Sequence, residues 1–156
     1  MWSGDNLFSS TLSSDYLIQT TKIFVNFMYQ KVISSIKWYL IHSDFSLENL
    51  FSKPPKDIGI PAISLYELEV GIAKSLAPRK RTQQLREMTS LVNIIPFGDR
   101  EAKVSAAIRV KLEKQGTPIG PYDLLIGGTA LAHQAILVTH NTVEFERIEN
   151  LRIEDW

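Results

Sequence analysis

Residues 120–141 read GPYDLLIGGTALAHQAILVTHN and place two predicted helices on either side of a strand. Gly120-Pro121 predicts a helix that begins at the proline, because the first helical position does not need the N–H group that proline lacks. Ala135–Thr139 is the most strand-like run in the chain, and Asn141 stands where the next helix is expected to begin. This order of elements is typical of a parallel sheet whose strands are connected by helices.

The same alternation continues on both sides of this stretch. We expect further strands at 58–63, 93–97 and 151–153, and helices at 64–75, 82–92 and 99–115. The fold class indicated is therefore α/β: one domain with an open, mostly parallel sheet flanked by helices. We assign this domain to residues 31–156. Residues 1–30 are rich in Ser, Thr and Asn without a clean period, and we interpret them as a poorly determined extension.

Composition narrows the classes of function. With 156 residues, 44% of them hydrophobic, the chain can bury a core. Its 17 basic and 17 acidic side chains balance, which argues against a general nucleic-acid coat or a polybasic membrane binder. The absence of cysteine excludes disulfides, zinc–thiolate sites and thiol catalysis. The apolar stretch 23–41 contains two lysines, so we expect no membrane span and a cytoplasmic protein.

Acidic and amide side chains are expected to meet at one edge of the sheet. Glu67 and Asp123 both fall in predicted first turns of helices, and Asn141 follows a predicted strand. Ligands of open parallel sheets bind at the carboxyl ends of the strands, where such junctions gather. Converging carboxylates repel one another unless a cation lies between them, and hard oxygen ligands select Mg²⁺ or Mn²⁺. Such an ion supports phosphodiester hydrolysis.

Each of these side chains also has a purely structural interpretation. Ser64 and Glu67 fit a capping box, in which the glutamate only bonds the start of its helix. Asp123 would gain from the helix dipole, and Asn141 and Asp99 would serve as N-caps. The pair Gly127-Gly128 is best explained by close packing between helices.

Basic residues concentrate on the predicted helix 99–115. A solvated helix face is the ordinary explanation for such a cluster. If the acidic edge binds RNA, Arg109, Lys111 and Lys114 are candidates for contacts to phosphate groups, which position a strand without reading its sequence.

The text of residues 60–75, IPAISLYELEVGIAKS, and of residues 96–156, PFGDREAKVSAAIRVKLEKQGTPIGPYDLLIGGTALAHQAILVTHNTVEFERIENLRIEDW, closely resembles the PIN-domain endoribonucleases. The likeness is to the VapC-type toxins of type II toxin–antitoxin pairs. It implies Mg²⁺-dependent RNA cleavage, a cognate antitoxin and a homodimer. By this resemblance Glu67 and Asp123 are metal ligands, and Asn141 occupies a fourth catalytic position.

The chain departs from the family at the first acidic position, which in the family follows the first strand. Counting back from Glu67 leads to residues 32–37, where Ser34 or its neighbour stands at the expected place. No carboxylate lies between Asp15 and Asp44, Asp44 is close to Glu67 in sequence, and Asp15 is distant. The first ligand is thus interpreted as missing, which leaves an impaired nuclease or, as the alternative, a catalytically inactive PIN-like protein that binds an antitoxin.

Overall fold

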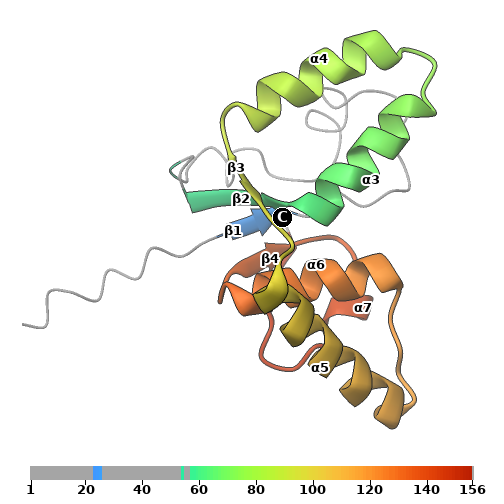
Figure 1. Ribbon diagram of the computed structural model, residues 1–156, viewed down its shortest axis with the longest axis vertical. Helices are drawn as coiled ribbons and strands as arrows, with labels where there is room; N and C mark the ends of the chain where they lie inside the picture. The colour runs from blue at the N-terminus through green and yellow to red at the C-terminus, as the bar shows by residue number, and fades with distance from the viewer. Residues whose placement is uncertain (1–22, 26–53, 55–56, 156) are drawn as a thin grey trace, which may run out of the picture.

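The computed structural model describes residues 23–25, 54 and 57–155, and the strands among them form one parallel sheet. The sheet has five strands in the order β3-β2-β1-β4-β5 (Figure 1). The strands are β1 (Ile23–Val25), β2 (Ile58–Pro61), β3 (Asn93–Ile95), β4 (Ile136–Val138) and β5 (Arg152–Glu154). Every neighbouring pair runs parallel, which confirms the predicted α/β class.

Strand β1 occupies the middle of the sheet. Its residues pair with β2 on one side and with β4 on the other, where Val25 lies opposite Val138. This central strand comes from the segment that the sequence suggested as an extension, so the sheet begins before residue 31. The remaining residues of 1–30 lie outside the described part of the chain, as do residues 32–37, to which the count back from Glu67 led.

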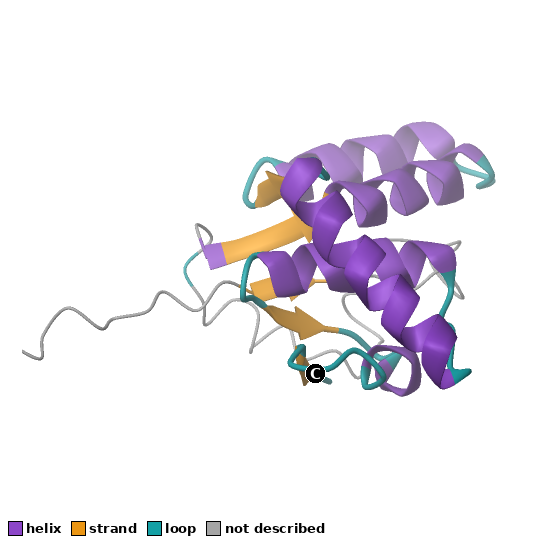
Figure 2. Ribbon diagram, turned by 60° about the horizontal axis from the view of Figure 1, so that its bottom comes forward, coloured by secondary structure: helices purple, strands orange, loops and turns teal. Residues whose placement is uncertain are grey.

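Five helices connect the described strands. They are α3 (Ala62–Ala73), α4 (Pro78–Thr89), α5 (Asp99–Gln115), α6 (Pro121–Ala132) and α7 (Thr142–Phe145). Helices α3 and α4 form a hairpin after β2, and α5 and α6 lie side by side after β3 (Figures 1 and 2). None of these described helices is both long enough and apolar enough to cross a lipid bilayer.

Three helix starts differ from those expected. Helix α3 begins at Ala62, directly after Pro61, and not at Ser64, whose side chain is fully buried. Helix α4 begins at Pro78, four residues before the expected start at residue 82. Helix α5 has Gly98 as its N-cap instead of Asp99. At two of these starts, Pro61 as N-cap and Pro78 at the first turn, the proline's fixed φ suits entry into a helix.

The core lies between the sheet and the pair α5–α6. Ile126, Leu137, Val138 and Phe145 are completely buried. The backbone of α6 passes close to its neighbours at two glycines, as the sequence predicted. A Cβ atom at Gly128 would lie 3.0 Å from the Cα atom of Ser105 on α5, which leaves no room for a side chain. The tight packing fixes α6, and with it the position of Asp123.

Candidate active site

The two predicted acidic ligands, Glu67 and Asp123, come from helices that pack against each other, α3 and α6. Both side chains are half-buried. Burial raises the pKa of the Glu67 carboxyl, and the negative charge of Asp123 raises it further. The structure therefore brings the carboxylates together across a sequence separation of more than fifty residues, as the parallel topology implied.

Helix α3 excludes the capping-box interpretation of Glu67. Because the helix begins at Ala62, Glu67 lies in its second turn, and the first turn contains no acidic residue. Ser64 is inside the helix and makes no cap. Glu67 is therefore free of the structural role that its spacing from Ser64 suggested, and its half-buried carboxyl has no part in starting the helix.

Asp123 lies in the first turn of α6, as predicted, and a second acidic group approaches it. Burial raises the pKa of the Asp123 carboxyl, and the charge of Glu144 on α7 adds to this effect. Glu144 is not among the site residues predicted from the sequence. Its Oε2 atom lies 3.5 Å from Nη1 of Arg147, a basic partner that offsets part of its charge.

Asn141 contacts Asp123 directly. Its Nδ2 atom donates a hydrogen bond to Oδ2 of Asp123 over 3.2 Å. Asn141 does occupy the N-cap position of α7, but its side chain makes no capping hydrogen bond. Its backbone N–H instead donates to Oγ1 of Thr139 at 3.1 Å. The side chain that was expected to cap α7 thus orients a carboxylate of the site.

The residues present fit a hard divalent cation. Both carboxyls are half-buried, and the charge of Asp123 raises the pKa of Glu67 while the charge of Glu144 raises that of Asp123, so a positive charge placed among them would be favourable. Among the described residues, no group of three or more His, Asp or Glu side chains is arranged as a metal site. Mg²⁺ is nevertheless commonly held by only one or two carboxylates, with water and substrate phosphate completing its coordination. Glu67 and Asp123, with the amide oxygen of Asn141, provide such a set.

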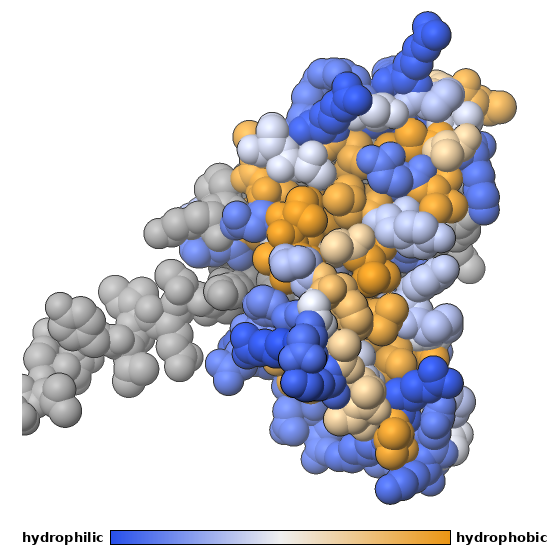
Figure 3. All heavy atoms as spheres, viewed as in Figure 1, coloured by the Kyte–Doolittle hydropathy of each residue, from blue (hydrophilic) through white to orange (hydrophobic). Residues whose placement is uncertain are grey.

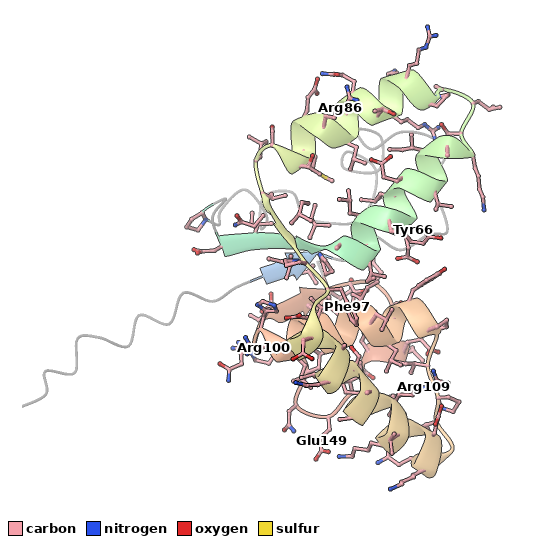
Figure 4. The ribbon with its side chains drawn as sticks, in the orientation of Figure 1. Tyr66, Arg86, Phe97, Arg100, Arg109 and Glu149 are labelled. Carbon is pink, nitrogen blue, oxygen red and sulfur yellow. The ribbon has the colours of Figure 1, made fainter. Side chains whose placement is uncertain are left out.

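Two tyrosines flank the carboxylates. Tyr66 precedes Glu67 and Tyr122 precedes Asp123, and their ring centroids are 5.7 Å apart. A hydrogen bond with Tyr66 raises the pKa of the Tyr122 hydroxyl, and the charges of Tyr66 and Glu67 add to the rise. In Figure 4, Tyr66 projects from α3 on the side that faces α6. Neither tyrosine is among the site residues predicted from the sequence, although each is next to a predicted ligand in the chain.

The three candidate phosphate contacts on α5 have different surroundings. Nε of Arg109 lies 2.7 Å from Oε1 of Glu113, and Lys111 forms an ion pair with Glu149. Lys114 is exposed in the last turn of the helix. All three face solvent, so a role in binding RNA stays a prediction, and two of them would have to share their charge with an acidic partner.

The first acidic position lies beyond the described residues. The chain leaves β1 at Val25 and continues in the sequence with Asn26, whose placement the structure does not describe, as it does not describe that of Ser34. Since β1 is the strand between β2 and β4, the residue that follows the central strand in sequence is an amide. The place of the missing carboxylate in the sequence therefore stays a prediction.

Comparison with known proteins agrees with this architecture. The PIN domain family model matches residues 38–151, and the chain belongs to this family. It is 40% identical over 97 residues to the tRNA(fMet)-specific endonuclease VapC of Salmonella typhimurium, a match that covers 62% of this chain and 74% of the relative. It is 53% identical over 94 residues to ribonuclease VapC1 of Haemophilus influenzae, covering 60% of this chain and 70% of the relative.

A solved structure supports the same assignment. The toxin–antitoxin complex VapBC from Salmonella typhimurium, crystallised with DNA, contains a chain that matches this one with a TM-score of 0.74 and 30% sequence identity. The match covers 87% of this chain and 98% of the other. The relatives of this PIN-domain protein are thus ribonucleases of the VapC type, as the sequence motifs suggested.

Proposed function

We propose that this chain is a metal-dependent endoribonuclease, the toxin of a type II toxin–antitoxin pair. The observation that carries the proposal is the approach of Glu67 on α3 to Asp123 on α6, close enough for the charge of one to raise the pKa of the other. The relatives of the chain, which are named as ribonucleases, support the same chemistry. Mg²⁺ or Mn²⁺ is the cofactor proposed for the site.

The residues of the site would have two roles, binding the cation and orienting the reacting groups. Glu67 and Asp123 would hold the cation, which when bound supplies positive charge at a phosphoryl oxygen and lowers the pKa of a water molecule. Asn141 fixes one oxygen of Asp123 through its amide, leaving the other oxygen for the ion. Its second amide hydrogen would orient the attacking water or the scissile phosphate. Partial burial of both carboxyls limits competing water and strengthens these interactions.

The test is cleavage of RNA by the purified full chain in the presence of Mg²⁺. Asp123→Asn keeps the size of the side chain and an acceptor for Asn141 but removes the charge, so we expect cleavage to fall at least about 10- to 100-fold. Glu69→Gln is the matched control, because Glu69 is an exposed carboxylate on α3. Cleavage that is unchanged in Asp123→Asn would remove Asp123 from the active site.

RNA would be positioned in part by α5. Arg109, Lys111 and Lys114 are the proposed phosphate contacts, and Lys114 lies in the last turn of the helix. Because counterion release makes such contacts salt-dependent, replacing them with alanine should weaken RNA binding and flatten its dependence on salt.

Partners would complete the assembly. We propose a cognate antitoxin, a homodimer and a cytoplasmic location, by analogy with the VapBC complexes among the structural relatives. Hydrophobic side chains are exposed on α4–β3 and α5, namely Leu91, Ile94 and Val110. Figure 3 shows hydrophobic residues gathered over the α3–α4 hairpin and the adjoining β3. Such patches are typical of protein–protein contacts.

The alternative function is that of a catalytically inactive relative that only binds an antitoxin. The observation in its favour is that no carboxylate stands between Asp15 and Asp44 in the sequence, so β1 is not followed closely by an acid. A metal site with one ligand fewer loses affinity and activity.

Adding a carboxylate after β1 separates the two functions. Asn26→Asp changes an amide to an acid directly after the strand, whereas Ser34→Asp places it where the spacing from Glu67 suggested. We expect Asn26→Asp to increase RNA cleavage by at least about 10-fold and Ser34→Asp to have no effect. An increase in RNA cleavage with Ser34→Asp alone would place the missing carboxylate at Ser34, as the count back from Glu67 suggested. An inert parent that neither variant activates would favour the antitoxin-binding alternative.

A further inference from the structure

Tyr66 and Tyr122 form an exposed pair of aromatic rings between the two helices that supply the acidic site. Their ring centroids are 5.7 Å apart and the ring planes are inclined by 57°. Tyr66 is 51% exposed and Tyr122 is 45% exposed. Tyr66 precedes Glu67 on α3 and Tyr122 precedes Asp123 on α6, so the ring pair joins the same two packed helices that carry the carboxylates.

Packing alone does not account for this arrangement. The hydrophobic core of the described residues is formed elsewhere, around Ile126, Leu137 and Phe145, and contains neither tyrosine. A tilted ring pair stabilises itself modestly, but rings that remain half in water gain little from burial. Large exposed aromatic groups that gather beside polar catalytic groups are typical of ligand-binding surfaces.

The chemistry of the neighbours restricts the ligand. Phosphate groups would bind at the carboxylates through the cation, and a base of a neighbouring nucleotide would then be carried toward the rings on the same two helices. Unpaired bases stack on aromatic side chains, whatever their identity, because every base has a π-face. Bases inside a duplex are already stacked on each other and cannot use such a surface without unpairing.

We propose that Tyr66 and Tyr122 form a stacking platform for one unpaired base next to the scissile phosphate. The proposal rests on the proposed function for the nature of the substrate, RNA, and it adds the two side chains that would hold the base beside the cleaved position. The platform would favour loops and unpaired segments over duplex, with little preference among the four bases.

The test measures stacking separately from cleavage. All proteins carry Asp123→Asn, which prevents cleavage and removes one repulsive charge, and each binds a short single-stranded RNA with 2-aminopurine at one position, scanned along the strand. Stacking quenches the fluorescence of this base. We expect Tyr66→Ala and Tyr122→Ala to weaken binding about 5- to 30-fold and to abolish the quenching at one position. Phenylalanine at either position should retain both.

Controls make each outcome informative. Leu76→Ala removes a side chain that is 99% exposed and should change nothing. Tyr66→Leu keeps a large apolar side chain but lacks the flat ring, so it is less disruptive to the fold than alanine. We expect it to weaken RNA binding and abolish the quenching as Tyr66→Ala does. Equal binding and quenching across the alanine, leucine and phenylalanine variants overturns the platform, as does an equal loss with phenylalanine, which would assign the effect to the hydroxyls.

The failure of this proposal is distinguishable from the failure of the proposed function. If the chain cleaves RNA but its RNA binding does not change when either ring is removed, the proposed function stands and the stacking platform is wrong. A protein that cleaves no RNA, and in which the rings affect binding of an antitoxin peptide and not of RNA, assigns the pair to a protein partner and overturns both.

Discussion

At the scale of single residues, the electrostatics of Asp123 define the acidic site. Its carboxyl is half-buried, accepts a hydrogen bond from Asn141 and stands in the fields of Glu67 and Glu144. The folded protein therefore binds a proton at Asp123 more tightly than the unfolded chain does, because burial and the charge of Glu144 raise its pKa. A side chain that is ionised at neutral pH at the expense of stability is characteristic of a functional position.

Asp123→Asn should consequently stabilise the protein at pH 7 in the absence of divalent cations. A raised pKa in the folded state means that stability is greatest with the carboxyl protonated and falls as the pH rises from the ordinary value of 3.8 through the raised one. The extra stability of Asp123→Asn over the wild-type protein should therefore decrease as the pH falls below the raised pKa of Asp123. Thermal unfolding in EDTA at several pH values measures it.

Glu69→Gln, which replaces an exposed carboxylate on the neighbouring helix, is the control for a general change in charge. A wild-type protein that is as stable as Asp123→Asn at neutral pH would show that Asp123 is not held at an energetic cost.

At the scale of elements, helix α5 depends on Glu101 for its start. The side chain is 7% exposed, its Oε2 atom accepts the backbone N–H of Gly98 at 2.8 Å, and Oε1 lies 2.9 Å from Nε2 of His133 at the end of α6. One carboxylate thus joins the beginning of one helix to the end of the next. These hydrogen bonds, led by those from the backbone, lower the pKa of Glu101.

Glu101→Ala should reduce the free energy of unfolding by about 1–3 kcal/mol, because it leaves a backbone donor and a half-buried imidazole without their acceptor. Denaturant unfolding at pH 7 measures this loss. Asp99→Ala is the matched control, since its ion pair with Lys103 lies in solvent and should contribute no more than about 1 kcal/mol. Equal losses in the two variants would contradict the role assigned to Glu101.

At the scale of the whole molecule, the acidic site lies between two segments of the chain. Glu67 belongs to the α3–α4 hairpin that follows β2, and Asp123 to the α5–α6 pair that follows β3. The parallel sheet brings both to the same edge, and burial of like charges there costs stability until a cation binds. We therefore expect binding of a divalent cation at this site to stabilise the folded protein.

Mg²⁺ should raise the thermal unfolding temperature of the wild-type chain, and EDTA should reverse the change. A ligand at 100 times its dissociation constant stabilises the folded state by about 2.7 kcal/mol. In Asp123→Asn this gain should be largely lost, while Glu69→Gln should retain it. A shift of equal size in all three proteins would show that the ion binds somewhere other than between α3 and α6.

Predictions from the sequence were correct for features that depend on neighbouring residues and wrong for features that depend on distant parts of the chain. Pro121 begins α6, and α5 ends at residue 115 because Gly116 takes the left-handed conformation; the start expected at Pro121 and the end expected at residue 115 are both confirmed. Ser64 and Asp99 are residue types that are common at N-caps. The N-cap of α3 is nevertheless Pro61, and that of α5 is Gly98. Ser64 lies inside helix α3 and is fully buried. Its burial depends on the tertiary structure, which the residues next to it in the sequence do not reveal.

The amino-acid sequence by itself determined the parallel α/β architecture and the family, because the alternation of apolar strands with helices and the motif around Asp123 are properties of neighbouring residues. Only the tertiary structure decided that Glu67 is no capping residue, that Asn141 orients Asp123, that residues 23–25 provide the central strand, and that Tyr66 meets Tyr122. Each of these depends on contacts between segments distant along the chain, and such contacts are formed only when the sheet assembles.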